Sequence, residues 1–259
     1  MADVVIVERS ESTAVVTLNR PDQRNALSSE LIRAVPPILA ELDADDDVTA
    51  IVLTGADPAF CAGLDLKELG STGGNLGVGG ADGSARRGPF GELSTPLIGA
   101  VNGVAVTGGL EYALACDFLI ASDRAGFADT HARVGVMPGW GLTVLLPQAV
   151  GVRRARQMSV TGNYVDAATA LAWGLVNEVV PHDGLLPRAL QLGRDIASND
   201  RAGVAQMLRT YRATNDVDGA TAWEVESRLA AEWSPRISPE EVERRRGAIQ
   251  DRGRGQVGG

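Results

Sequence analysis

The chain has 259 residues, a formal net charge of −9 and a pI of about 4.8. This acidic balance argues against nucleic-acid binding and against attachment to a membrane surface, because both need basic patches. Its two cysteines lack the spacing of a metal or redox motif, and no apolar run approaches the ~20 residues of a membrane span. The start MADVVIVERS has no basic region followed by a long apolar run, so we expect a cytoplasmic protein without a signal peptide.

Five short apolar runs have the length and composition of buried β-strands. Glycine-rich turns separate several of them from segments with helical periodicity. This recurring order of strand, glycine turn and helix predicts an α/β fold in which helices cover the sheets. The predicted strands are Val4–Val7, Ala14–Leu18, Ala50–Leu53, Pro96–Val101 and Phe118–Ala121.

The first helix is expected to begin at Ser28 or Ser29, because serine caps helix N-termini, and to run toward Leu42. Pro36 and Pro37 fall inside this segment. Since proline has no N–H to donate, we expect a kink or a break there. Further helices are predicted at Gly108–Cys116, Arg153–Thr161, Asp166–Trp173 and Leu185–Ile196.

Glycine accumulates between residues 70 and 91, in the stretch GSTGGNLGVGGADGSARRGPFG. Few of its side chains can pack into a core, so we expect a mobile loop of the kind that can serve as a lid. The stretch lacks the Gly-Lys-Ser/Thr ending of a phosphate-binding loop.

The last quarter of the chain, from about Asn199, shows helical patterns and no strand pattern. Ser238, Pro239 and Glu241 form the signature of a helix start: a cap, a proline in the first turn and a capping-box glutamate. We therefore predict a core of residues 1–198 that carries the chemistry and a helical region of residues 199–259 used for assembly.

Two glycine turns, CAG at residues 61–63 and TGG at residues 107–109, each join a predicted strand to a predicted helix. The N–H groups at the start of a helix have no partner within it, and the helix dipole favours negative charge there. Two such turns facing each other would form an oxyanion hole with two N–H donors. Glu111, one turn into the second helix, is the candidate acid–base group beside it, although a first-turn glutamate can also merely complement the helix dipole.

Five specific blocks stand in order along the chain: TLNRPDQRNALS (17–28), GADPAFCAGLDLKEL (55–69), PLIGAVNGVAVTGGLEYALACD (96–117), FADTHARVGVMPGWG (127–141) and ALAWGLVNEVVP (170–181). Together they resemble the crotonase superfamily, whose typical member is enoyl-CoA hydratase. The resemblance covers about Val4 to about Leu186, and extends more loosely to the C-terminus. It implies a crotonase-like α/β spiral of ββα units, followed by a helical C-terminal region that mediates trimers, often paired into hexamers.

The resemblance also implies an acyl-CoA ligand whose thioester carbonyl accepts two backbone N–H bonds. These donors map onto Leu64 and Gly108, in agreement with the argument from the two turns. Among the positions that match the path of the CoA arm, Arg24 carries the charge suited to a phosphate. The substrate-binding positions implied in this way are Arg24, Ala26, Ala62, Gly63, Asp65 and Leu66.

The sequence departs from the pattern of the typical family member at two places. That member holds its water with two glutamates; Glu111 matches the first, but His131 stands at the position of the second. Histidine can also act as an acid or a base, and Asp129 would share a face with it in an extended segment but not in a helical turn. Trp140 occupies a position where the family usually has small residues, so we expect it to shape the acyl pocket or simply to pack in the core.

These features favour an enoyl-CoA hydratase with Glu111, His131 and Asp129 as its catalytic candidates. The alternatives are an enoyl-CoA isomerase or another reaction that needs one glutamate, such as thioester hydrolysis or decarboxylation, and a non-catalytic acyl-CoA-binding protein. No cofactor or metal is expected beyond the CoA of the substrate. A dinucleotide-binding dehydrogenase is excluded because GVAVTGG lacks the G-x-G-x-x-G spacing. The expected assembly is a homotrimer or a hexamer.

Overall fold

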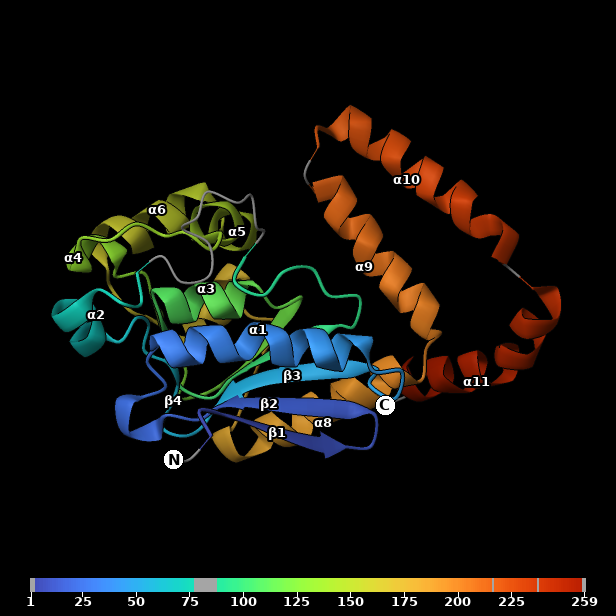
Figure 1. The fold of residues 1–259 in the computed structure, drawn as a ribbon. Helices are drawn as coiled ribbons and strands as arrows, with labels where there is room; N and C mark the ends of the chain where they lie inside the picture. The colour runs from blue at the N-terminus through green and yellow to red at the C-terminus, as the bar shows by residue number, and fades with distance from the viewer. Residues whose placement is uncertain (1–2, 77–87, 216, 237, 258–259) are drawn as a thin grey trace. The chain divides into compact units, whose positions relative to one another are not determined.

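A computed structural model describes residues 3–76, 88–215, 217–236 and 238–257 (Figure 1). Contacts divide the chain into two compact units, Met1–Ala205 and Gln206–Gly259. The division falls within helix α9 (Arg201–Asn215), whereas the sequence places it between residues 198 and 199. The assignment of chemistry to one part and assembly to the other stays a prediction.

The first unit contains two sheets. The larger has the strand order β1-β2-β3-β5-β7-β10, and all its pairs are parallel except the β1–β2 hairpin. The smaller has the order β4-β6-β8-β9, with β8 and β9 antiparallel. The strands are β1 (Val5–Ser10), β2 (Thr13–Leu18), β3 (Ala50–Gly55), β4 (Ala59–Cys61), β5 (Leu97–Val101), β6 (Val104–Val106), β7 (Phe118–Ser122), β8 (Gly126–Ala128), β9 (Val165–Asp166) and β10 (Glu178–Val180).

Three consecutive strand pairs, β3–β4, β5–β6 and β7–β8, each place their first strand in the larger sheet and their second in the smaller one. A helix follows each pair: α2 (Leu66–Thr72), α3 (Gly108–Leu114) and α4 (His131–Val134). The chain therefore advances as a spiral of ββα turns, which confirms the predicted architecture. The consequence for function is that β4, β6 and β8 end side by side, so the segments that follow them gather at one edge.

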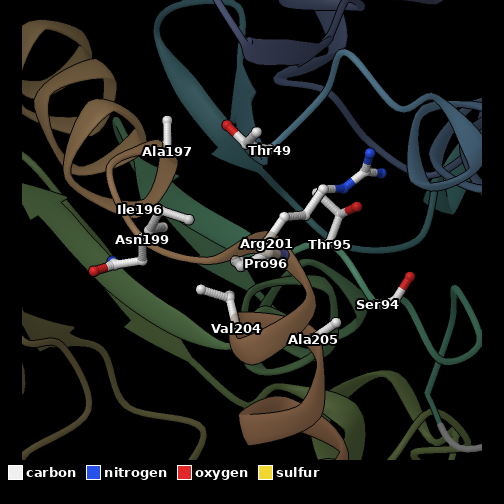
Figure 2. A pocket seen from close by; sticks show the side chains of 10 residues that line it. All are labelled: Thr49, Ser94, Thr95, Pro96, Ile196, Ala197, Asn199, Arg201, Val204 and Ala205. Carbon is white, nitrogen blue, oxygen red and sulfur yellow. The ribbon is translucent and has the colours of Figure 1, made fainter. Parts of the chain in front are cut away.

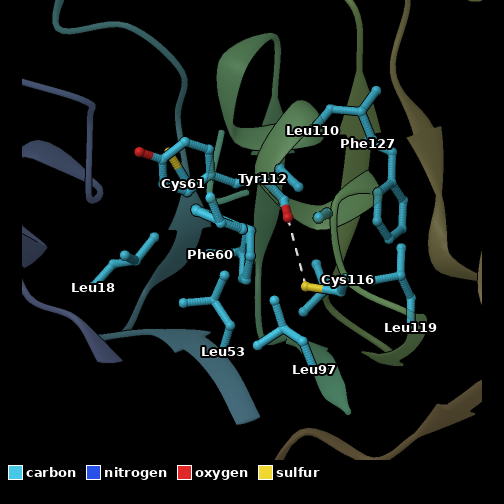
Figure 3. Close-up of a cluster of buried hydrophobic side chains, with 14 of the residues drawn as sticks. Leu18, Leu53, Phe60, Cys61, Leu97, Leu110, Tyr112, Cys116, Leu119 and Phe127 are labelled. Atoms are coloured by element: carbon cyan, nitrogen blue, oxygen red, sulfur yellow. Dashed lines mark hydrogen bonds between the residues drawn. The ribbon is translucent and has the colours of Figure 1, made fainter. Parts of the chain in front are cut away.

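The core is built mainly from aliphatic side chains on both faces of the larger sheet. On one face of the sheet, Val15 and Val52 pack against Leu185 and Ala189 of α8 (Leu185–Ala197). On the other face, the next residues along the strands, Val16 and Leu53, belong to the larger core cluster that includes the buried side of α1 (Ser29–Ala44). Strands buried on both faces read as continuous apolar runs, as these do. In Figure 3, side chains from the strands of both sheets and from α3 lie around Tyr112. The free thiol of Cys116 donates to the backbone oxygen of Tyr112 at 3.5 Å.

Helix α1 does not break at its two prolines, which was one of the two expected outcomes, because it continues through both of them. Ser28 caps it as predicted, accepting a hydrogen bond from the Leu31 N–H at 3.2 Å. Pro36 and Pro37 leave carbonyls of the preceding turn without their usual donors, which is a local cost. The stripe of buried side chains, Leu31, Ile32, Val35, Leu39 and Leu42, offsets it by packing against the sheet.

The helices predicted at Gly108–Cys116, Arg153–Thr161, Asp166–Trp173 and Leu185–Ile196 are present with small differences at their ends, whereas the sequence did not predict the helix Leu142–Val150. Helix α2 ends at Thr72, so residues 70–72 are helical rather than part of the expected loop; residues 77–87 of that loop lie outside the described residues. In α11, the Glu241 N–H donates to Ser238 Oγ at 3.4 Å, as the capping signature predicts. The helices whose bounds have not yet been given are α5 (Leu142–Val150), α6 (Val152–Thr161), α7 (Ala167–Trp173), α10 (Gly219–Trp233) and α11 (Pro239–Val257).

Candidate active site

The two glycine turns of the sequence lie next to each other because β4 and β6 are parallel neighbours. Parallel strands end at the same edge of a sheet, so the turns that follow them meet there. The contact is close: a Cβ added to Gly109 would lie 2.2 Å from the Cys61 carbonyl oxygen, and one added to Gly63 would lie 2.7 Å from the Val106 carbonyl oxygen. Only glycine allows the two backbones to approach this closely.

The Leu64 and Gly108 N–H groups, one from each turn, have no acceptor among the described residues. The neighbouring amides are engaged: the Leu27 N–H donates to the Gly63 carbonyl at 2.7 Å, and the Asp65 N–H donates to the Leu27 carbonyl at 3.0 Å. Gly108 is buried and Leu64 is half-buried. Two unused donors at the facing turns have the chemistry of an oxyanion hole.

Glu111 is 2 % exposed and lies on α3, one turn after Gly108. Its Oε1 accepts hydrogen bonds from the backbone N–H groups of Trp140 at 2.7 Å and Leu142 at 3.4 Å. Its Oε2 lies 3.5 Å from Nε2 of His131. Because burying a carboxylate is costly without such partners, these contacts account for its position and hold its orientation.

His131 and Asp129 complete a buried chain of three titratable groups with Glu111. Asp129 Oδ1 lies 2.6 Å from His131 Nδ1 and also accepts the His131 backbone N–H at 3.1 Å. Burial lowers the pKa of His131, but the nearby carboxylates of Asp129 and Glu111 raise it by more. The net pKa is about 9. Burial raises the pKa of Asp129, and its hydrogen bond with His131 lowers it to a net value below the ordinary one. At neutral pH the imidazole is therefore charged and offers N–H donors on both sides.

Trp140 lies over the second turn. Its backbone binds Glu111, and its ring comes within 3.3 Å of the place where a Gly108 Cβ would stand. The ring also packs against Tyr112, with centroids 5.6 Å apart, and Tyr112 packs edge-on against Phe90 at 4.7 Å. Trp140 thus packs in the core and also lies beside the second turn, and its role in shaping an acyl pocket stays a prediction.

The substrate-binding positions surround the first turn, but they differ in availability. Arg24 is exposed, and its carbonyl accepts the Ala62 N–H at 3.0 Å. Asp65 is occupied: it pairs with Arg20 at 2.9 Å and accepts the N–H groups that begin α2. The side chain of Leu66 is 59 % exposed, whereas Ala26 and Gly63 are buried and Ala62 is half-buried.

Two residues that hold the first glycine turn in place, Arg20 and Asn75, are not indicated by any pattern in the sequence. Arg20 links the loop before α1 to the first turn, since it binds Asp65 and the carbonyl of Ala26. Asn75 is 2 % exposed, and its Nδ2 donates to the carbonyls of Leu27 and Asp65 at 3.1 and 3.0 Å. The Arg20–Asp65 and Asn75–Leu27 contacts each join residues far apart along the chain, so no local pattern could have indicated them.

Two cavities in the described part of the chain lie away from this site. Figure 2 shows one of about 30 Å³, formed at the start of α9 and bordered by Thr49 and Pro96. Its charged residue, Arg201, is bound to Asp46 at 2.8 Å. A hollow of about 450 Å³ is lined by residues of α6, β9 and α7. Among the described residues, no group of three or more His, Cys, Asp or Glu side chains is arranged to hold a metal ion, and none of the helices is long and apolar enough to cross a membrane.

Comparison with known proteins places this geometry in context. Residues 8–245 match the model of the enoyl-CoA hydratase/isomerase family. The chain is 40% identical over 208 residues to the probable enoyl-CoA hydratase echA8 of Mycobacterium bovis, with 80% of each chain covered. It is 37% identical over 233 residues to the short-chain-enoyl-CoA hydratase of Clostridium acetobutylicum, covering 86% of this chain and 87% of that one.

The same likeness appears among solved structures. The enoyl-CoA hydratase of Mycobacterium tuberculosis H37Rv superposes with a TM-score of 0.76 and 46% sequence identity, covering 88% of this chain and 98% of that one.

Proposed function

This chain belongs to the enoyl-CoA hydratase/isomerase family, and we propose that it adds water across the 2,3-double bond of an enoyl-CoA thioester. The observation that carries the proposal is the buried Glu111–His131 pair beside two unused backbone N–H donors. Hydration needs both the N–H donors and the acid–base pair. Charge develops on the thioester oxygen, while water loses a proton as it bonds to C3 and C2 gains a proton.

In this proposal the Leu64 and Gly108 N–H groups bind the thioester oxygen. Attack of water at C3 moves electron density from the double bond onto that oxygen, which gives an enolate-like transition state. Fixed donors stabilise this charge more than they stabilise the neutral carbonyl, so they lower the barrier. Loss of one such donor typically costs about 3 kcal/mol of transition-state stabilisation.

Glu111 is the proposed base and His131 the proposed acid. Glu111 Oε2 takes a proton from water as the oxygen bonds to C3, and protonated His131 supplies a proton to C2. The charged form of His131 that its surroundings favour suits this donor role, whereas the second glutamate of the typical hydratase would need to be protonated. Asp129 holds the imidazole through Nδ1, so that Nε2 faces Glu111.

An isomerase is the second candidate, and the observation that favours it is that His131 stands where the typical hydratase has its second glutamate. Moving a double bond from C3 to C2 needs one group that takes a proton from C2 and returns it at C4, a task that Glu111 could perform alone. The family itself includes both activities by name. A non-catalytic acyl-CoA-binding protein is disfavoured because it has no need to hold a carboxylate and an imidazole together in a buried site.

The proposal extends to the ligand and the assembly. Arg24 is exposed for a phosphate of the CoA arm, Leu66 offers apolar surface at the first turn, and the substrate's CoA is the only cofactor-like group required. We place the enzyme in the cytoplasm as a homotrimer or hexamer. Exposed apolar side chains on α9–α11, among them Trp223 at 73 % and Ile249 at 63 %, support assembly through this unit.

The test is to mix the protein with crotonyl-CoA and to follow the loss of the conjugated enoyl-thioester absorbance. We expect turnover by the native protein and a rate lower by about 10²–10⁴-fold for Glu111→Gln, because the acid–base group is lost. Glu30→Gln is the matched control, since Glu30 is an exposed glutamate in the first turn of α1. It should leave the rate unchanged.

A 3-enoyl-CoA substrate separates the alternatives. A gain of conjugated absorbance from that substrate, without loss of crotonyl-CoA absorbance, would replace hydratase by isomerase. Binding of both thioesters without turnover of either would favour the non-catalytic protein. Equal rates for Glu111→Gln and the native protein would leave Glu111 as a residue that only complements the helix dipole.

A further inference from the structure

Thr107, the residue before Gly108, has a backbone conformation that is unusual for its type. Its φ is 54° and its ψ is −115°. Four non-glycine residues in the described part of the chain have positive φ, and Thr107 is the β-branched one among them. A β-branched residue is strained in this region, so the surrounding structure must hold it there.

The side chain of Thr130 supplies that hold. The Oγ1 atoms of Thr107 and Thr130 are 2.5 Å apart, and the Thr130 backbone N–H donates to Thr107 Oγ1 at 3.2 Å. The Thr107 backbone is fixed as well, because its N–H donates to the Ala128 carbonyl at 2.9 Å and its carbonyl accepts the Glu111 N–H at 3.0 Å. Thr107 is 4 % exposed, so water competes little for these bonds.

The two threonines connect the two halves of the proposed active site. The ψ angle of Thr107 sets the plane of the peptide that carries the Gly108 N–H, and therefore the direction in which that donor points. Thr130 stands between Asp129 and His131 at the N-cap position of α4, and its side chain makes no capping hydrogen bond there. A shift of the hydroxyl pair would move the N–H donor relative to the acid–base residues.

We propose that Thr107 and Thr130 are positioning residues whose paired hydroxyls aim the Gly108 N–H at the thioester oxygen and fix its distance from His131. The inference deepens the proposed function and rests on it, since it assigns a task to the oxyanion hole. Neither hydroxyl touches substrate in this proposal. Their effect passes through the orientation of one backbone amide.

The test compares Thr107→Val, Thr130→Val and Thr107→Ser with the native protein. Valine keeps the β-branched shape but removes the hydroxyl, whereas serine keeps the hydroxyl. Thr49→Val is the matched control, because Thr49 Oγ1 also bonds a hydroxyl, that of Ser12, at 2.9 Å and lies away from the site. Crotonyl-CoA reports kcat and KM. A cinnamoyl-CoA thioester reports carbonyl polarisation, because its absorbance moves to longer wavelength when donors bind the oxygen.

Both valine variants should lower kcat by about tenfold to a hundredfold, with KM changed less than about threefold, because the donor is misaligned mainly for the transition state. Both should reduce the wavelength shift of bound cinnamoyl-CoA. Thr107→Ser should retain most of the shift and of kcat, and Thr49→Val should retain all of both. The double valine variant should be no worse than Thr107→Val, because that single variant already loses the bond between the two hydroxyls and the acceptor of the Thr130 N–H.

The inference is overturned if Thr107→Val keeps the native kcat and wavelength shift, or if it changes only the melting temperature, as a purely structural residue would. Failure of the proposed function gives a different pattern. A native protein that shifts the cinnamoyl absorbance but does not hydrate crotonyl-CoA loses the hydratase assignment, while the valine variants still test the positioning role through the shift. A native protein that binds the thioester without any shift overturns both.

Discussion

Asp129 and His131 come together although the segment that joins them is neither a strand nor a regular helical turn. An extended segment would place the two on one face, and a helical turn would separate them. The structure uses neither arrangement, because Asp129 lies between the end of β8 and the start of α4. There its carboxylate turns back to bind both the backbone and the ring of His131, as aspartate does in local turns.

Replacing Asp129 by asparagine tests the electrostatic part of this pair. Asparagine keeps an oxygen for the imidazole N–H but removes the charge that helps to raise the pKa of His131 to about 9. Since the proposed acid is protonated His131, native activity should fall as pH rises through about 9. In Asp129→Asn the pKa falls, so this alkaline limit should move to lower pH by roughly one unit or more. The pH dependence of kcat/KM between pH 6 and 10 measures it.

His131→Gln is the companion variant, because glutamine cannot titrate in this range. It should remove the alkaline limit together with most of the activity. An alkaline limit that stays at the same pH in Asp129→Asn would show that His131 is not the group responsible, and would leave Glu111 as the sole acid–base residue.

At the scale of elements, the contact of α3 with β4 decides the geometry of the site. Gly109 touches the backbone of Cys61 so closely that a methyl group would collide with a carbonyl oxygen, which cannot move as a side-chain tip can. Gly109→Ala should therefore push the two turns apart. We expect a loss of about 1–3 kcal/mol in the free energy of unfolding, together with a lower kcat, measured by chemical denaturation and by hydration of crotonyl-CoA.

Gly70→Ala provides the matched control for that substitution. Gly70 lies in α2 and has open space where its Cβ would stand. Alanine is the better helix former, so this variant should gain up to about 1 kcal/mol of stability and keep its activity. Equal stability of the two alanine variants would contradict the close contact between the turns.

At the scale of the whole molecule, the two units differ in how they bury apolar side chains. Most of the core lies in the first unit, whereas Leu229 is the one fully buried apolar side chain in the described part of residues 206–259. Large apolar side chains on the second unit are exposed instead: Met207, Tyr211, Trp223, Val242 and Ile249. A unit with so little core of its own needs further burial, which subunit assembly would supply.

The double variant Trp223→Ser, Ile249→Ser tests this role. It removes two large exposed side chains, so the proposed trimer or hexamer should dissociate to smaller species by light scattering. Ile6→Ser is the control, because Ile6 is also exposed, at 40 %, but lies on the edge strand β1. If the double variant keeps the native mass, assembly does not depend on these side chains.

The sequence by itself determined the strands β1, β2, β3, β5 and β7, the helix start at Ser28 and the two glycine turns. These features are readable because each depends on neighbours within a few residues: apolar runs, caps and glycine act locally. The resemblance of five ordered blocks then indicated the spiral fold and the family. The identity of Glu111 as the candidate acid–base group came from the same local pattern and that resemblance.

Only the tertiary structure decided which groups meet. The support that Arg20 and Asn75 give the first turn and the contact between Trp140 and Glu111 join residues far apart in the sequence. So does the hydroxyl pair of Thr107 and Thr130. Such contacts arise because parallel strands bring distant chain segments to one edge, and no local periodicity encodes which side chains then face each other. The continuation of α1 through its prolines has the same origin, since packing against the sheet outweighs a local preference.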